Sequence, residues 1–194
     1  MDLRDIAGVL RTAGAASRSH FDFSLLQPTG IPRGALTEIS GAHGAGKTEV
    51  VLQFLAEHTE VRTAWIEDKM TAYPVAFPQN GVALNRVLFA QAGRDPLWTA
   101  HQILRSGIFP IVVLMAGAIN ELELRRLQLS AEKSDSSVIT LTEKPTLTRT
   151  WPIRLQLAVS RKSEDHQHRC KIEILKGPSF GNRLLHYISG ERRG

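Results

Sequence analysis

The chain has 194 residues, of which 42% are hydrophobic and 22% charged, a balance typical of a folded core and not of a disordered chain. It contains no run of about 18 apolar residues that would span a membrane, and its first residues lack the basic-then-apolar layout of a secretion signal. A single cysteine, Cys170, excludes an internal disulfide and a cysteine-based zinc cluster. We therefore expect one cytoplasmic domain with no membrane contact.

Positive charge is concentrated in the last third of the chain. Residues 1–124 contain 10 Lys and Arg against 12 Asp and Glu, whereas residues 125–194 contain 14 against 7. A local net charge of +7 suits nucleic acid or an acidic protein as a partner. A solvated basic face explains the same counts, so composition leaves both interpretations open.

The apolar pattern predicts strands that alternate with helices over the first 142 residues. A short helix is expected within residues 1–20, with an apolar stripe formed by Leu3, Ile6, Val9 and Leu10. Further helices are predicted at 47–58, 96–106 and 121–132, and strands at 35–40, 61–67, 87–91, 108–115 and 138–141. Pro74 and Pro78 are expected to break regular structure. Such alternation is typical of a mostly parallel sheet with helices on both faces.

The last part of the chain has a different pattern. Short strands are predicted at 153–159, 170–175 and 183–188, separated by turns without helices, which favours antiparallel pairing. The expected fold class is therefore α/β, with a mostly parallel central sheet flanked by helices and an antiparallel C-terminal extension. We divide the chain into an N-terminal arm at 1–24 and a single core domain at 25–194.

One segment matches the phosphate-loop pattern G-x-x-x-x-G-K-[ST] in full: Gly41, Ala42, His43, Gly44, Ala45, Gly46, Lys47 and Thr48. It stands between a predicted strand and a predicted helix, as the pattern requires. Backbone N–H groups of such a loop surround phosphate oxygens, and the helix N-terminus adds roughly half a positive charge. Lys47 would reach the β and γ phosphates, and the Thr48 hydroxyl would bind the metal. We predict a site for ATP or ADP with Mg²⁺, the alternative being a loop that no longer binds nucleotide.

A longer segment around this loop carries a resemblance to a known family. The sequence Gly-Ile-Pro-Arg-Gly-Ala-Leu-Thr-Glu-Ile-Ser-Gly at 30–41 leads into Gly46-Lys47-Thr48, and together they resemble the strand and phosphate loop of bacterial RecA recombinases. Weaker likeness covers most of residues 25–190, including the apolar strand at 111–113, although only the phosphate loop is highly specific. The resemblance implies a RecA-type P-loop core.

Three positions depart from this family where its chemistry is carried out. Lys69 stands where the resemblance implies a carboxylate that activates the attacking water. Leu114 stands where it implies an aspartate that supports Mg²⁺, and Glu143 where it implies a glutamine that senses the γ-phosphate. Loss of a general base lowers a rate by about 10²–10⁴, and leucine offers no oxygen to Mg²⁺. These changes argue against an efficient ATPase, with Glu67 and Asp68 as candidate substitutes for the missing base.

The resemblance also implies two DNA-binding loops, here at 115–121 and 143–151, and both are short. The candidate contacts with nucleic acid or a partner protein are Lys144, Arg149, Arg154 and Lys176. Of these, Lys176 resembles a lysine that reaches the nucleotide of a neighbouring subunit. Ordinary surface charge explains all four as well, and we expect DNA binding to be weak or indirect.

A short RecA-like core with reduced loops and altered chemistry is similar to the ImuA type, RecA-like accessory proteins of bacterial mutagenesis cassettes. That resemblance implies a role in SOS-induced translesion DNA synthesis. The implied partners are an ImuB-like, Y-family-related protein, an error-prone replicative-type DNA polymerase and RecA. We expect action by binding, through the apolar helix residues at 3–10 and through the edge strands of the sheet by strand addition.

Three alternatives remain open at this point. The first is an active DNA-dependent ATPase of recombination or repair, which needs a carboxylate close to Lys69. The second is a regulator that caps RecA filaments and binds no nucleotide. The third is a DNA-binding module that acts through the basic last third and binds DNA in a strongly salt-dependent way.

Overall fold

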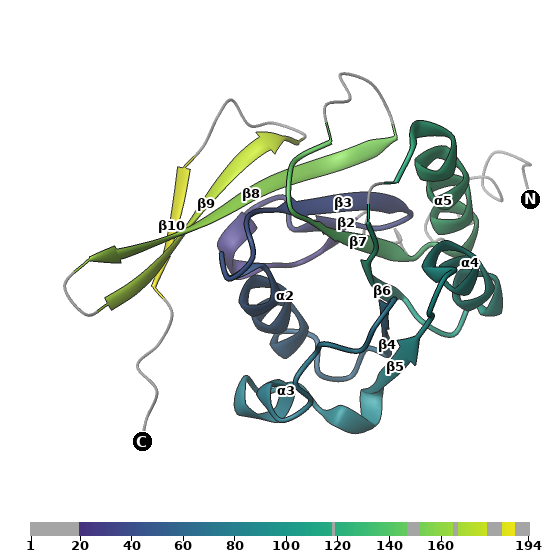
Figure 1. Ribbon diagram of the computed structural model, residues 1–194, viewed down its shortest axis with the longest axis horizontal. Helices are drawn as coiled ribbons and strands as arrows, with labels where there is room; N and C mark the ends of the chain where they lie inside the picture. Colours follow the sequence, from purple (N-terminus) through teal and green to yellow (C-terminus); the bar gives the residue numbers. More distant parts are fainter. Residues whose placement is uncertain (1–19, 118, 147–151, 165–166, 178–183, 189–194) are drawn as a thin grey trace, which may run out of the picture.

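The computed structural model describes residues 20–117, 119–146, 152–164, 167–177 and 184–188. Its main feature is an eight-stranded sheet with the strand order β10-β9-β8-β3-β7-β6-β4-β5 (Figure 1). The strands are β3 (Ala35–Ser40), β4 (Thr63–Glu67), β5 (Val87–Gln91), β6 (Ile111–Met115), β7 (Ser137–Thr142), β8 (Ile153–Glu164), β9 (Gln167–Lys176) and β10 (Leu184–Ile188). The helices are α2 (Lys47–Ala56), α3 (Ala76–Gln79), α4 (Pro96–Ser106) and α5 (Glu121–Ser134).

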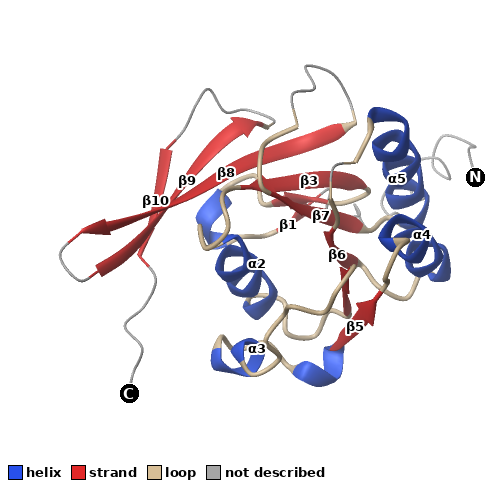
Figure 2. Cartoon of the chain, viewed as in Figure 1, coloured by secondary structure: helices blue, strands red, loops and turns tan. Residues whose placement is uncertain are grey.

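The sheet joins a parallel core to an antiparallel hairpin (Figure 2). Strands β3, β7, β6, β4 and β5 are parallel to their neighbours, and β8 is also parallel to β3. Strand β9 pairs antiparallel with β8, and β10 pairs antiparallel with β9. The predicted fold class is confirmed, and its antiparallel part begins at the β8–β9 hairpin.

Helices α2 and α3 cover one face of the sheet, and α4 and α5 cover the other (Figure 1). Successive strand residues alternate between the faces. On β6, Val113 packs in the apolar cluster under α2, whereas Val112 and Leu114 pack in the cluster under α4 and α5. The four inward-facing residues predicted for α2 are all buried, namely Val50, Val51, Phe54 and Leu55. Burial of each such side chain contributes about 1.5–3 kcal/mol.

Local signals set several element ends where the sequence predicts them. The bounds of β3, β5 and α4 agree with the predicted ranges. Asp95 caps α4 by accepting a hydrogen bond from the backbone N–H of Trp98 at 3.0 Å, and Pro96 occupies the first turn. Gly107 ends the helix in the left-handed conformation, at φ 66°.

The expected break near Pro78 is wrong in part, because a helical turn forms there. Helix α3 includes Pro78, and its Phe77 is only 1% exposed. The Phe77 ring packs edge-to-face on Trp65 at 5.2 Å and on Phe89 at 4.9 Å between ring centroids. Burial of this aromatic ring against β4 and β5 outweighs the local proline signal.

The helix predicted within residues 1–20 lies almost entirely outside the described residues. Where the described chain starts, β1 (His20–Phe21) pairs antiparallel with β2 (Ile31–Pro32). The rings of Phe21 and Phe23 lie 6.1 and 5.4 Å from the ring of Phe54 on α2. Residues assigned to the arm at 1–24 therefore contribute to the core, and the division into arm and core stays a prediction.

Among the described residues, no helix has the length and apolar character needed to cross a bilayer.

Candidate nucleotide-binding site

The predicted phosphate loop joins the carboxyl end of β3 to the first residue of α2. The backbone N–H of Gly41 donates to the carbonyl of Thr142 at 3.1 Å, which ties the start of the loop to β7. Gly44 and Gly46 have φ angles of 77° and 100°, a conformation that other residues adopt only with strain. The loop therefore depends on its glycines for its path, as the sequence pattern predicts.

Lys47 folds back over the loop that precedes it. Its ammonium donates hydrogen bonds to the carbonyls of Gly41 and, at 3.1 Å, Ala42. Partial burial lowers the pKa of Lys47 below the ordinary lysine value of 10.5, and the carboxylate of Glu143 opposes this shift. Glu143 therefore lies close enough to the phosphate loop to act electrostatically on Lys47.

The residues present fit a bound nucleotide better than they fit a bound metal. Lys47 and the loop N–H groups would hold phosphate, and the exposed Thr48 hydroxyl would offer one oxygen to Mg²⁺. Leu114 is fully buried in the apolar cluster under α4 and α5. The Leu114 side chain therefore contributes to core packing and offers no oxygen to a metal. Apart from the Thr48 hydroxyl, the oxygen ligands of Mg²⁺ would have to come mostly from the phosphates.

The two candidate substitutes for the general base lie in different surroundings. Glu67 is 1% exposed, and its carboxylate accepts hydrogen bonds from the Trp65 indole at 2.6 Å, the Thr71 hydroxyl at 2.8 Å and the Ala72 N–H at 3.2 Å. The backbone N–H of Thr71 donates to the same carboxylate. Glu67 thus holds the loop after β4 in place.

Asp68 lies on the surface beside the position of the missing base. It is exposed, and its carboxylate accepts a hydrogen bond from the Lys69 N–H at 2.7 Å. Asp68 and Lys69 line an open cleft of about 620 Å³ at the carboxyl ends of β4 and β5. The other lining residues are Gln91, Gly93, Arg94, Pro96 and Gly117. Only Asp68 of the two candidates is free to face solvent.

The four candidate contacts for nucleic acid or a partner are not brought together. Lys144 is exposed just beyond the carboxyl end of β7, on the phosphate-loop side. Arg154 is exposed near the start of β8, at the opposite end of the parallel strands from the phosphate loop. Lys176 ends β9 and pairs with Gln156, and burial lowers its pKa. Arg149 lies outside the described residues.

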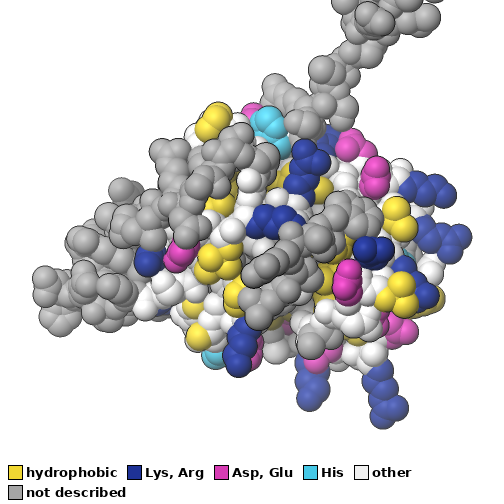
Figure 3. All heavy atoms as spheres, turned by 90° about the horizontal axis from the view of Figure 1, so that it is seen from above, with side chains coloured by type: hydrophobic (Ala, Val, Ile, Leu, Met, Phe, Trp, Pro, Cys, Tyr) yellow, Lys and Arg dark blue, Asp and Glu magenta, His cyan; other side chains and the backbone are white. Residues whose placement is uncertain are grey.

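The charged side chains on one face of the molecule are also dispersed. In Figure 3 the Lys and Arg side chains on the visible face are spread among acidic and apolar ones and do not form one continuous basic patch. On this face, the described side chains therefore form no dedicated basic patch for DNA.

Glu38 is a buried residue of this region that the sequence analysis did not assign to the site. It lies on β3 at 1% exposure and accepts hydrogen bonds from the Thr146 N–H at 3.0 Å and from the Gln156 side chain at 2.9 Å. It therefore ties the loop after β7 to the strand that carries the phosphate loop. The sequence feature that could have identified Glu38 is a charged residue within a short, otherwise uncharged strand, since such a residue needs hydrogen-bond donors when it is buried.

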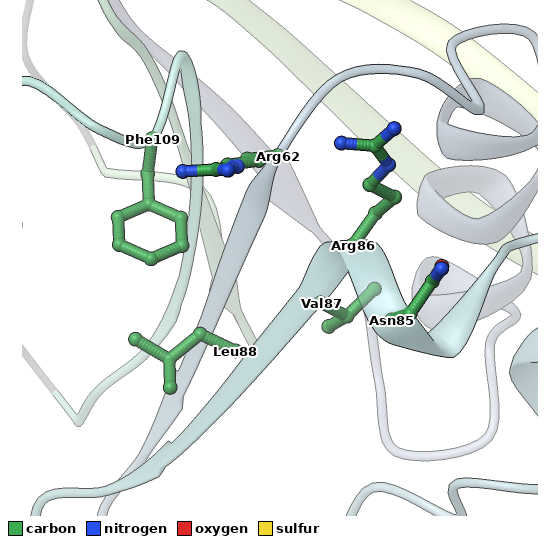
Figure 4. Close-up of a pocket in the computed structure, with 6 residues that line it drawn as sticks. All are labelled: Arg62, Asn85, Arg86, Val87, Leu88 and Phe109. Carbon is green, nitrogen blue, oxygen red and sulfur yellow. The ribbon is translucent and has the colours of Figure 1, made fainter.

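A second pocket of about 350 Å³ lies at the amino ends of β4 and β5, the opposite end of the strands from the phosphate loop. Its lining residues are Arg62, Asn85, Arg86, Val87, Leu88 and Phe109. Figure 4 shows the side chain of Arg62 extending toward the ring of Phe109, with Leu88 beside them. This pocket combines cationic and apolar groups.

The chain is similar to known proteins in both sequence and fold. No protein-family model matches the chain. The chain is 31% identical over 113 residues to Protein RecA of Caldanaerobacter subterraneus subsp. tengcongensis, covering 56% of this chain and 32% of that protein. It is 31% identical over 136 residues to Protein RecA of Chlorobium chlorochromatii, covering 68% of this chain and 37% of that protein. The chain thus matches about a third of the length of these relatives.

The fold of the chain is also similar to that of a solved recombinase structure. The RadB recombinase crystal structure superposes with a TM-score of 0.67 over 89% of this chain and 94% of that chain, at 14% sequence identity. At this identity the likeness establishes the fold alone. Sequence similarity to RecA and the fold shared with RadB together support a RecA-like P-loop core.

Proposed function

We propose that this chain is a nucleotide-binding, RecA-like accessory protein that engages partner proteins and does not hydrolyse ATP rapidly. One observation carries the proposal, namely the contrast between the phosphate loop and the acidic residues near it. The loop keeps its glycine geometry and its folded-back Lys47. The carboxylate of Glu67, in contrast, is buried and accepts four hydrogen bonds, one from the Trp65 indole on β4 and three from Thr71 and Ala72 in the loop that follows.

Slow hydrolysis follows from the surroundings of these groups. A general base needs a lone pair directed at the water that it activates. Glu67 is buried and held by hydrogen bonds from Trp65 and Thr71, which it would lose if its carboxylate turned toward a water molecule at the nucleotide. Asp68 is exposed in an open cleft with Lys69 beside it, and Leu114 gives Mg²⁺ no support. These features favour a protein that binds nucleotide and retains it.

The finer assignment is to the ImuA type. We propose an accessory role in SOS-induced translesion synthesis and mutagenesis, with an ImuB-like protein, RecA and an error-prone replicative-type polymerase as partners. The support is the altered catalytic positions and the dispersed basic residues, which favour protein partners over direct DNA binding.

The sheet edge at β5 is the surface best suited to a protein partner. Within the part of the chain that the structure describes, strand β5 ends the sheet and pairs only with β4, so its outer edge is suited to receive an added strand. Leu88 on this strand is 42% exposed and lines the pocket that contains Arg62 and Phe109. Among the described residues Arg86 pairs with Glu60 at 3.1 Å, and no carboxylate partner is found for Arg62. An extended peptide with an acidic and an apolar side chain matches this edge.

Titration with nucleotide tests the first part of the proposal. Wild-type protein is expected to bind ATP and ADP in the presence of Mg²⁺, with turnover that single-stranded DNA does not stimulate. DNA-stimulated turnover would instead support the alternative of an active ATPase of recombination or repair. Absence of any nucleotide binding would support a filament-capping regulator.

Capture of purified partners tests the second part. We expect the wild-type chain to retain an ImuB-like protein or RecA, and Leu88→Glu or Arg62→Glu to reduce retention at least tenfold. Leu129→Glu is the matched control, because Leu129 is also exposed, at 58%, but lies on α5 away from the β5 edge. Retention that is unchanged by the β5-edge variants would refute this surface, and failure of the wild type to retain either partner would refute the accessory role.

A further inference from the structure

The β8–β9 hairpin lies directly against the phosphate loop. A Cβ atom placed on Gly41 would lie 2.3 Å from the Val159 carbonyl oxygen of β8. A Cβ atom placed on Gly46 would lie 2.5 Å from the Cys170 sulfur of β9. Real side chains do not approach so closely, so both glycines serve the hairpin contact as well as the path of the loop.

An ion pair crosses from the hairpin to the helix that follows the loop. A guanidinium nitrogen of Arg161 on β8 lies 2.5 Å from a carboxylate oxygen of Glu49, in the first turn of α2. The two side chains are 35% and 26% exposed. The Cys170 thiol donates to the Ala45 carbonyl at 3.6 Å on the same side of the loop. The Arg161–Glu49 pair is therefore one part of a built contact and not an isolated surface pair.

The location of this pair matters for anion binding. The Arg161 nitrogen and the Glu49 oxygen each lie 3.6 Å from the Cβ position of Gly46, the residue before Lys47. Glu49 also directly follows Thr48 in the sequence. A carboxylate here stabilises the N-terminus of the helix on its own, but it repels the negative charge of a phosphate group bound to the loop. The first turn of α2 thus contains a residue that opposes the predicted ligand of the loop unless its charge is balanced.

We infer that Arg161 is a positioning residue for a nucleoside di- or triphosphate. It neutralises Glu49, so that Lys47 and the loop N–H groups meet the phosphates without a nearby uncompensated carboxylate. This inference rests on the proposed binding of nucleotide at residues 41–48. It adds a hairpin residue to a site that the sequence motif limits to one loop.

A charge-rescue series on the full chain tests the inference, with ATP and ADP affinity in Mg²⁺ as the measurement. Arg161→Ala is expected to weaken binding about tenfold, because it leaves Glu49 uncompensated near the phosphates. Glu49→Gln in the Arg161→Ala background is expected to restore most of the affinity. Glu49→Gln alone is expected to tighten binding, since it leaves the Arg161 charge in place. The loss in Arg161→Ala should be larger for ATP than for ADP and should shrink at high salt.

Lys171→Ala is the matched control on the same hairpin. Lys171 follows Cys170 on β9, where alternation directs it to the opposite face, and it lies 3.9 Å from Glu173. Removal of this charge should leave nucleotide affinity within twofold of wild type. Thermal unfolding of every variant would identify any loss of affinity that comes from loss of fold.

The outcomes separate this inference from the proposed function. Wild-type protein that binds no nucleotide would overturn both. Wild-type binding with no loss in Arg161→Ala would overturn the inference alone, as would a double variant that binds as weakly as Arg161→Ala. A Glu49→Gln variant that weakens binding only in Mg²⁺ would instead make Glu49 a metal ligand and would also overturn it.

Discussion

The carboxyl ends of β3 and β4 belong to one sheet, but they have different chemical roles. After β3, the glycines, Lys47 and the start of α2 keep the sequence pattern and backbone path of a phosphate loop. After β4, the carboxylate of Glu67 is buried in hydrogen bonds that hold its own loop. In the proposed function, anion binding and water activation are separable, because each depends on a different strand end.

The largest expected effect is on the side that binds phosphate. Lys47→Ala should weaken ATP affinity at least 100-fold, because it removes the cation that lies over the loop. Lys133→Ala is a control, since Lys133 is exposed in the last turn of α5. Equal affinity of the wild type and Lys47→Ala, measured by calorimetry, would mean that the loop does not bind nucleotide.

The next effect concerns Leu114 on β6, where the resemblance to RecA implies an aspartate. Leu114→Asp should destabilise the fold by about 3 kcal/mol or more, because a carboxylate would enter the apolar cluster under α4 and α5. Leu114→Met should cost less than about 1.5 kcal/mol. Denaturant unfolding measures both. A Leu114→Asp variant as stable as wild type would show that this position opens toward the nucleotide.

The third effect distinguishes a structural carboxylate from a catalytic one. Glu67→Ala should lower the free energy of unfolding by about 2–3 kcal/mol, because the Trp65 and Thr71 donors would lose their acceptor. Asp68→Ala should change it by less than about 0.5 kcal/mol, because Asp68 is exposed. If urea titration finds the two variants equally stable, Glu67 does not hold the loop after β4.

The smallest effect concerns Glu143. Glu143→Gln should tighten ATP binding about two- to fivefold, because it removes a negative charge that acts on Lys47. Lys47 contributes to phosphate binding below its pKa and loses that contribution above it. Because Glu143 raises this pKa, the variant should lose affinity at lower pH than wild type does. A pH series of binding titrations in which the two curves overlay would contradict this coupling.

The sequence predicts the parts of the molecule that are encoded locally. Periodicity, caps and the glycine pattern are enough to place β3, β5, α4 and the phosphate loop. The turn at Pro78 was missed because its stability comes from Phe77 packing against Trp65, a contact between segments that the local pattern does not reveal.

The candidate site was predicted less completely than the fold. Glu67 and Asp68 are neighbours in the sequence, yet one is buried and hydrogen-bonded and the other is exposed, because strand alternation and the following loop separate them. The contact of Arg161 with Glu49 spans 112 residues along the chain. Such pairs depend on which strands become neighbours in the sheet, and one sequence gives no direct signal of that.

The most direct test of the central claim is the rate of ATP turnover by the full-length wild-type chain at saturating ATP and Mg²⁺, with and without single-stranded DNA. The account predicts bound nucleotide with little turnover in either condition. Rapid turnover that Glu67→Gln or Asp68→Asn abolishes, in variants that still bind ATP, would contradict it.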